Sequence, residues 1–218
     1  MSEIMRKNVE KMSINYSPNF DLKKRTSSKV KYLIFHYTGM RSENAAIKRL
    51  TSKSSKVSCH YLIKKNGAII KIVPDLYIAW HAGISSWKKD KSLNSNSIGI
   101  EISNPGHDYK YKNFSQKQIT SIIELSKKLK KKYKIKKENI LGHSDIAPLR
   151  KKDPGEKFPW KLLNKKKICL WHNLSEKNCK KLRGIKINNS DNFFQLLFKF
   201  GYKSTNDKNK KIKIYKNF

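Results

Sequence analysis

Acidic residues are scarce in this chain. Its 218 residues include 50 Lys and Arg against 16 Asp and Glu, which gives a formal net charge of +34 at pH 7. Only six of the basic residues are Arg, and no helix-turn-helix, zinc-finger or RNA-recognition pattern is present, although base readout relies on Arg. A lysine-rich chain with much Asn and Ile is typical of an A+T-biased genome. We therefore expect no specific nucleic-acid partner, while a general affinity for polyanions, including an anionic cell wall, stays open.

Long apolar runs are also missing. No stretch approaches the roughly 18–20 residues that span a bilayer. The first twenty residues mix charged and polar groups and contain no apolar segment of a secretory signal. We therefore expect no transmembrane segment and a cytoplasmic location, with the cell envelope as the alternative.

Cysteine is present, but its number and spacing indicate neither a disulfide framework nor a metal site. The three cysteines are Cys59, Cys169 and Cys179, an odd number without the C-x-x-C spacing of a metal knuckle. A disulfide framework and a cysteine-based zinc site are both excluded as interpretations, and reduced thiols are expected.

Aromatic residues, in contrast, are plentiful. Four Trp, nine Phe and ten Tyr are too many for a disordered polyelectrolyte, so the sequence predicts a folded core inside a basic surface. We expect a basic arm over residues 1–28, with order beginning at Val30, a main domain over 29–172 and a short basic tail over 173–218. The apolar segment 192–202 predicts a small helical appendage packed on the main domain; an independent binding role for it remains open.

Alternating and continuous apolar runs predict the strands. A buried strand over 31–36 ends at His36, and two strands over 59–64 and 68–73 flank Asn66-Gly67, which predicts an antiparallel hairpin with a type I′ turn. In 97–103 three isoleucines alternate with Gly99 and Glu101, so Glu101 points away from the core. A short strand is expected over 138–143.

Two segments have helical spacing, 43–52 and 115–133. In the second, Ser115 and Gln118 form a capping box, Phe114 and Ile119 form a hydrophobic staple, and an apolar stripe follows at helical spacing while the lysines face water. The order strand, helix, hairpin, strand, helix, strand predicts an α/β fold with one mixed sheet covered by helices, followed by the C-terminal helical appendage.

Three residues form a candidate metal site. His36 and His143 each end a predicted strand, and Asp153 follows ten residues after His143. Two imidazoles and a carboxylate leave an open position on Zn²⁺, which is the arrangement of catalytic zinc sites. Because 107 residues separate the two histidines, structural histidines with satisfied hydrogen bonds remain the alternative at this point.

Five sequence blocks carry a resemblance to a known family. In order along the chain they are Phe35-His36-Tyr37-Thr38, Ser58-Cys59-His60-Tyr61-Leu62-Ile63, Ala79-Trp80-His81-Ala82-Gly83, Asn96-Ser97-Ile98-Gly99-Ile100-Glu101, and Gly142-His143-Ser144-Asp145-Ile146-Ala147-Pro148 through Lys151-Lys152-Asp153-Pro154-Gly155. They resemble the zinc-dependent N-acetylmuramoyl-L-alanine amidases, the AmpD-like family, whose fold is shared with peptidoglycan recognition proteins and a phage amidase lysozyme. The resemblance implies one catalytic Zn²⁺ on His36, His143 and Asp153. It also implies hydrolysis of the amide between the lactyl group of N-acetylmuramic acid and L-alanine, in muropeptides or peptidoglycan.

The remaining residues of the site fit that chemistry. Zinc lowers the pKa of a bound water and polarises the carbonyl, but the reaction also needs proton transfer. Glu101 matches the family's catalytic Glu and would serve as general base and then acid. Lys151 lies two residues before Asp153, so in an extended stretch both side chains point the same way and the ammonium would stabilise the oxyanion, whereas Lys152 should point elsewhere.

The family resemblance also implies a substrate-lining segment. It comprises Trp80, His81, Ala82 and Gly83, where an aromatic face and a glycine allow close approach of a sugar or peptide, and Trp87 would extend this wall. His60 and His81 might be mistaken for metal ligands, but structural roles or contacts to the ligands are favoured. His107 and His172 have no motif around them and are expected on the surface or in packing.

One departure concerns the general base. Phage and animal relatives carry a tyrosine where this chain has Cys59, so Glu101 is taken as the base. Cys59 is expected as a small buried residue, with contact to the metal site as the alternative.

A catalytically silent peptidoglycan-binding protein of the same fold is the competing hypothesis, but such a protein does not need all five of the residues proposed for zinc binding and catalysis. A nuclease or peptidase using the same metal set is disfavoured by the five blocks. We expect a monomer.

Overall fold

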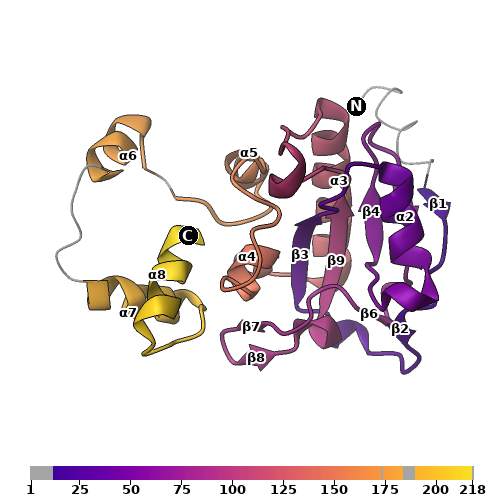
Figure 1. Ribbon diagram of the computed structural model, residues 1–218, viewed down its shortest axis with the longest axis horizontal. Coiled ribbons are helices and arrows are strands. Elements are labelled where there is room, and N and C mark those ends of the chain that lie inside the picture. Colours follow the sequence, from indigo (N-terminus) through magenta and orange to yellow (C-terminus); the bar gives the residue numbers. More distant parts are fainter. Residues whose placement is uncertain (1–11, 173, 184–189, 218) are drawn as a thin grey trace.

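Six strands form one mixed sheet at the centre of the protein (Figure 1). The computed structural model describes residues 12–172, 174–183 and 190–217. Four neighbouring strands run parallel, the next is antiparallel, and the edge strand is parallel to that one. In spatial order they are β1 (Met12–Ile14), β5 (Ile69–Lys71), β4 (Tyr61–Ile63), β9 (Ser97–Ile102), β3 (Tyr32–Tyr37) and β10 (Ile140–Gly142). The predicted mixed sheet covered by helices is confirmed.

Side-chain alternation gives the sheet two different faces. Ile98, Ile100 and Ile102 of β9 are fully buried and pack with Leu33 and Phe35 of β3 in the largest apolar cluster. The residues between them on both strands therefore point to the opposite face. That second face carries the polar residues on which the function depends.

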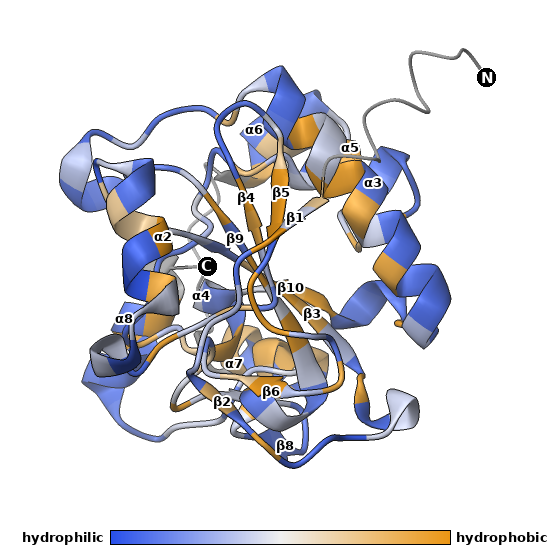
Figure 2. Cartoon of the chain, turned by 90° about the vertical axis from the view of Figure 1, so that its right-hand side faces the viewer, coloured by the Kyte–Doolittle hydropathy of each residue, from blue (hydrophilic) through white to orange (hydrophobic). Residues whose placement is uncertain are grey.

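Two helices cover the apolar face: α3 (Gln116–Tyr133) and α5 (Trp160–Lys165). The capping box predicted for α3 is present, since Ser115 Oγ accepts from the Gln118 N–H at 3.2 Å and the Gln118 side chain accepts from the Ser115 N–H at 3.0 Å. The predicted stripe is buried at Ile122, Leu125 and Leu129. Figure 2 shows this apolar side of α3 turned toward the strands, with hydrophilic residues outside.

The opposite face is covered at its two ends. The helix α2 (Glu43–Thr51), predicted over 43–52, lies over the β4–β5 side, and the short helix α4 (His143–Ile146) lies beside β10 and β3. Two small antiparallel pairs complete the main domain: β2 (Phe20–Asp21) with β6 (Ile78–Ala79), and β7 (Ser86–Trp87) with β8 (Asp90–Lys91). Short 3-10 helices occupy Ser27–Lys29, Lys53–Ser55, Leu93–Asn96, His107–Tyr109 and Lys137–Asn139.

Two sequence expectations are wrong in this region. Order does not begin at Val30, because β1 pairs with β5, β2 pairs with β6, and Arg25 is buried; residues 1–11 of the expected arm lie outside the described residues. The predicted hairpin β4–β5 forms, but its turn is not type I′. Asn66 lacks the positive φ that a type I′ turn requires, and Gly67 alone has one (φ 84°), which is the pattern of a three-residue loop.

The C-terminal tail forms three helices, α6 (Glu176–Arg183), α7 (Ser190–Phe200) and α8 (Lys208–Asn217). Leu197, Tyr202 and Ile214 join an apolar cluster with Trp87 and other residues of the main domain, and the Tyr202 hydroxyl donates to Asp145 Oδ1 at 2.6 Å. The predicted helical appendage packed on the main domain is confirmed. No helix in the described part of the chain has the length and apolar content to cross a membrane.

A buried carboxylate joins the sheet to α3. Asp75 is 4% exposed and accepts hydrogen bonds from the hydroxyl groups of Tyr61 and Tyr133 and from Lys132 Nζ. Burial alone would raise the pKa of Asp75, but these donors outweigh it and hold the pKa well below its usual range. The sequence analysis did not identify this network.

We expect the Asp75 network to make the free energy of unfolding depend on pH in the acidic range. Because the pKa of Asp75 is lower in the folded than in the unfolded protein, its contribution is present above pH ~4 and is lost as pH falls below that value. Asp75→Ala should lower the free energy of unfolding at pH 7 by about 3 kcal/mol, because two tyrosines and a lysine lose their partner. Urea unfolding between pH 2.5 and 7 measures both effects.

Glu176→Gln, which changes an exposed glutamate near Lys161, is the control and should leave the curve unchanged. A variant Asp75→Ala as stable as the wild type at pH 7 would contradict this account of the network.

Candidate metal centre and active site

The parallel register of β3 and β9 places two functional side chains next to each other. His36 of β3 is the partner of Glu101 on β9, and both project from the face opposite the isoleucines. They line a cavity of about 1070 Å³ between α2, α4 and the loops after β3, β9 and α4. The predicted orientation of Glu101, away from the core and into a site, is confirmed.

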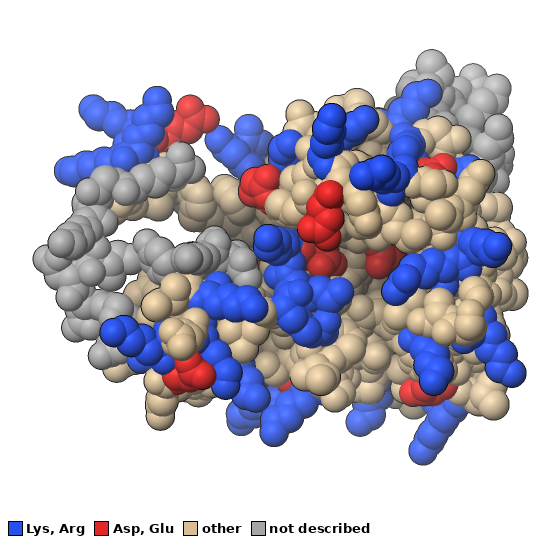
Figure 3. Space-filling model, viewed as in Figure 1, with Lys and Arg blue, Asp and Glu red and all other residues tan. Residues whose placement is uncertain are grey.

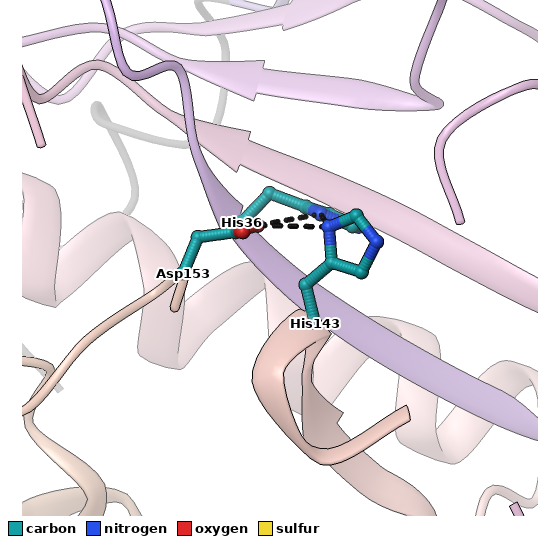
Figure 4. Close-up of side chains that lie close together, drawn as sticks. All are labelled: His36, His143 and Asp153. Atoms are coloured by element: carbon teal, nitrogen blue, oxygen red, sulfur yellow. Dashed lines mark hydrogen bonds and ion pairs between the residues drawn. The ribbon is translucent and has the colours of Figure 1, made fainter. Parts of the chain in front are cut away.

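His36, His143 and Asp153 meet in this cavity (Figure 4). The Nδ1 atoms of the two histidines are 2.9 Å apart, and Asp153 Oδ2 lies 3.0 Å from each of them. All three side chains are buried. The fold therefore brings together the three residues that the sequence analysis selected as metal ligands, across a separation of 117 residues.

The end of the strand β10 positions His143, the second histidine of the cluster. It ends at Gly142, so the strand predicted over 138–143 is shorter, and His143 is the first residue of α4. The Ser144 N–H donates to the Asp153 carbonyl at 2.8 Å, which ties the loop of Asp153 to this turn. Gly142 is needed here because a Cβ would collide with the ring of Pro154.

The three inward atoms fit a metal ion. His143 Nε2 lies 3.1 Å from the Ala82 carbonyl, which only accepts. Arg150 Nη2 is the more distant contact, at 3.3 Å, and donates to the same carbonyl, so the outer nitrogen of His143 carries the proton and Nδ1 offers a lone pair. Burial, followed by the charge of His143, lowers the pKa of His36 to about 4, which keeps that imidazole neutral. Ligands about 2.0–2.1 Å from a tetrahedral Zn²⁺ stand about 3.3 Å apart, close to the observed spacing.

Glu101 is a second feature that indicates chemistry. Its Oε2 is buried and has no hydrogen-bond partner among the described residues. Burial, and then the negative charge of Asp153, raise the pKa of Glu101 to about 8, while Lys151 opposes the shift. An unpartnered carboxyl group with a raised pKa beside a ligand cluster is typical of a catalytic acid or base.

Two lysines lie near the cluster. Lys151 lines the cavity, and its charge acts on both His36 and Glu101. This position agrees with the prediction that its ammonium group faces the site. Lys152 also lines the cavity; the expectation that its ammonium group points away from the metal ligands stays a prediction.

The predicted substrate-lining segment is only partly in the cavity. Trp80 and His81 line it, but Ala82 is fully buried and its carbonyl faces His143, and Gly83 lies against Arg150. Trp87 is 1% exposed because Phe200 and Tyr202 of the C-terminal tail cover its ring. The prediction that Trp87 extends the substrate wall is therefore wrong.

The other predicted histidine and cysteine roles can be placed as well. His60 accepts from the Gly99 N–H at 3.0 Å, contacts the Tyr77 carbonyl and stays outside the metal cluster, which confirms a structural role. Cys59 is fully buried in an apolar cluster, as expected of a small buried residue. His172 is exposed, in agreement with a surface position. His107, expected on the surface or in packing, lines the cavity and lies 2.9 Å from Glu156 Oε2.

Arginines at the cavity were not found from the sequence. Arg41, Arg49 and Arg150 are three of the six arginines in the chain, and all three line the cavity. The Arg41 guanidinium lies over the ring of Tyr109 at 4.8 Å. The signal that could have found them is the contrast with the 44 lysines, since Arg binds carboxylates in a planar, bidentate manner.

Comparison with known proteins gives one consistent result. The family model described as N-acetylmuramoyl-L-alanine amidase matches residues 26–156, more than half of the chain. The chain is 40% identical over 155 residues to AmiD of Escherichia coli, covering 66% of this chain and 55% of that protein. It is 41% identical over 106 residues to the 1,6-anhydro-N-acetylmuramyl-L-alanine amidase AmpD of Haemophilus influenzae, covering 48% and 55%. The chain thus spans about half the length of these curated relatives.

Solved structures extend the likeness into the tail. E. coli AmiD in complex with the substrate anhydro-N-acetylmuramic acid-L-Ala-D-gamma-Glu-L-Lys superposes with a TM-score of 0.77 at 33% identity, covering 91% of this chain and 82% of that one. AmpDH3 of Pseudomonas aeruginosa superposes with a TM-score of 0.75 at 28% identity, covering 92% and 86%. With the matched family model covering five of the six strands of the sheet and all three clustered residues, the chain belongs to the N-acetylmuramoyl-L-alanine amidase family.

Proposed function

We propose that this protein hydrolyses the amide bond between the lactyl group of N-acetylmuramic acid and L-alanine of the stem peptide, in muropeptides or peptidoglycan. The observation that carries the proposal is the cluster of His36, His143 and Asp153 in one cavity with the unpartnered carboxyl group of Glu101. Family membership favours this bond as the target. We assign the activity to residues 12–172, since β1 and β2 complete the main domain, and treat 173–218 as a docked tail.

In this proposal His36, His143 and Asp153 hold one Zn²⁺. When bound, the ion supplies Lewis acidity to the scissile carbonyl and makes water a stronger nucleophile. Glu101 accepts the proton of the attacking water and passes it to the leaving L-alanine amine, a task for which a pKa near neutrality is suited. Lys151 contributes positive charge where the oxyanion develops.

The charges around the cavity fit an acidic substrate. Muropeptides carry carboxylates on the stem peptide, and Arg41, Arg49 and Arg150 lie around the cavity with Lys151 and Lys152. We propose that the Arg41 guanidinium, held over Tyr109, pairs with one of these carboxylates. Trp80 would supply an apolar face for the sugar or peptide.

The two alternatives find less support. A silent peptidoglycan binder has no use for an unpartnered, buried glutamate beside a ligand cluster, because leaving such a group unpaired destabilises the fold. For a polyanion-binding protein, Lys and Arg would be expected to gather in one stripe, but they are scattered over the visible face in Figure 3 with Asp and Glu between them.

We expect activity to depend on the metal. Incubation with a chelator should abolish release of free stem peptide from a soluble muropeptide, and added Zn²⁺ should restore it, whereas Mg²⁺ should not, because imidazole ligands favour zinc. Mass spectrometry of the products measures this. Parallel reactions with intact sacculi identify the preferred substrate and so separate muropeptide recycling from action in the envelope. Undiminished cleavage by fully metal-free protein would exclude the proposal.

We expect Glu101→Gln to retain the metal and lose the rate. The amide is isosteric but cannot accept the proton, so kcat should fall by about 10²–10⁴-fold, while zinc affinity stays within the experimental error. Glu124→Gln, on α3 away from the cavity, is the matched control and should keep the wild-type rate. A rate for Glu101→Gln within a factor of about three of the wild type would remove Glu101 from the mechanism.

A further inference from the structure

Each histidine of the metal cluster has an outer nitrogen with a different kind of partner. The outer nitrogen of His143 faces a backbone carbonyl, that of Ala82. The outer nitrogen of His36 lies 3.0 Å from another imidazole nitrogen, Nδ1 of His81. A carbonyl fixes the proton of its partner by itself, but an imidazole does so only if its own tautomer is fixed.

The hydrogen bonds of Ser97 fix the tautomer of His81. Ser97 Oγ donates its only hydrogen to the Leu93 carbonyl at 2.5 Å, so toward His81 Nε2, 3.0 Å away, it only accepts. His81 Nε2 therefore carries a proton, and Nδ1 of the neutral ring has a lone pair. That lone pair accepts from His36 Nε2, which leaves His36 Nδ1 unprotonated and facing Asp153 and His143.

The backbone around His81 holds the other histidine of the cluster. Asn94 Oδ1 accepts from the N–H groups of His81 and Ala82 at 3.1 and 2.7 Å, which fixes this stretch of backbone. The Ala82 carbonyl then receives the proton of His143 Nε2. Two consecutive residues, His81 and Ala82, thus face the outer nitrogens of both histidines.

Space for the His81 ring comes from the sheet. Gly99 lies on the same face of β9 as Glu101, and a Cβ at Gly99 would collide with the His81 ring. Neighbouring positions on this face of β9 consequently serve different purposes: Glu101 faces the cavity, and Gly99 makes room for the imidazole that contacts His36.

We propose that His81 and Ser97 are positioning residues, which hold His36 in the tautomer and orientation that bind the metal ion. The sequence analysis placed His81 in the substrate wall and also favoured a structural role or a contact to the metal ligands; the hydrogen bond to His36 Nε2 favours the contact. It rests on the metal site of the proposed function. Removing partners of this kind from metal-ligating histidines typically lowers metal affinity by about 10–100-fold.

The test measures metal binding directly. Zn²⁺ affinity is determined by competition with a chromophoric chelator, and the visible spectrum of the Co²⁺-loaded protein reports the ligand geometry. His81→Phe keeps a ring but has no acceptor and should weaken Zn²⁺ binding by about 10–100-fold. Ser97 contacts no metal ligand directly, yet Ser97→Ala should weaken Zn²⁺ binding by about tenfold and alter the Co²⁺ spectrum. His81→Asn returns an acceptor near the position of Nδ1 and should recover most of the affinity.

Two matched variants control for structural damage. His60→Phe removes a fully buried ring that lies beside His81 and contacts no ligand, and Ser126→Ala removes a hydroxyl of α3 that is as buried as that of Ser97. Both should keep the wild-type affinity and Co²⁺ spectrum, and thermal unfolding of the metal-free proteins shows whether each variant is folded. If His81→Phe does not fold, Ser97→Ala and His81→Asn decide the question.

The outcomes separate this inference from the proposed function. Wild-type affinity and spectrum in Ser97→Ala and His81→Phe would overturn the positioning role, as would equal losses in His60→Phe and Ser126→Ala. A wild-type protein that binds Zn²⁺ but cleaves no lactyl amide would contradict the proposed function and leave the positioning role standing. A wild-type protein that binds no Zn²⁺ would overturn both.

Discussion

The register between β3 and β9 is the constraint on which the site depends. Parallel pairing of Leu33 with Ile98 and of Phe35 with Ile100 buries one face of both strands in the main apolar cluster. The same register sets His36 beside Glu101 on the other face. A shift of either strand by one residue would turn its functional side chain, the imidazole of β3 or the carboxyl group of β9, into the core. The packing that stabilises the sheet therefore also enforces the juxtaposition of metal ligand and base.

Around His36 and Glu101 lie polar groups whose burial in an apolar interior is unfavourable. Three atoms with lone pairs point toward one another within 3.0 Å, and a carboxyl oxygen of Glu101 is buried without a partner. Such an arrangement destabilises the metal-free protein and becomes favourable when a cation lies between the ligands. The compensation comes from elsewhere in the fold, from the isoleucine cluster and from the buried carboxylate of Asp75 with its three donors.

The sequence predicts the central strands and α3 better than the edge strand β1 and the contacts of the C-terminal tail. Alternating isoleucines and the capping box at Ser115 are local patterns that were found in the predicted place, and the strand predicted to end at His36 ends one residue later, at Tyr37. The segment Met12–Ile14 was missed because a three-residue edge strand is too short to show an alternating pattern. Trp87 was misplaced because its cover, Phe200 and Tyr202, comes from more than 100 residues away.

The functional site likewise contains some residues that the sequence identifies and others that it does not. His36, His143, Asp153 and Glu101 were identified from motifs, whereas the links through Ser97 and Asn94 were not, since a serine at the start of a strand and an asparagine in a short 3-10 helix carry no signal of what they contact. The central claim is that water cleaves the lactyl amide. The direct measurement is hydrolysis of a muropeptide in ¹⁸O-labelled water, followed by mass spectrometry of both products. The account predicts one ¹⁸O in the lactyl carboxyl group of the muramic acid product and an unlabelled stem peptide with a free L-alanine amine. Label within the peptide, or a muramic acid product that still carries L-alanine, would contradict it.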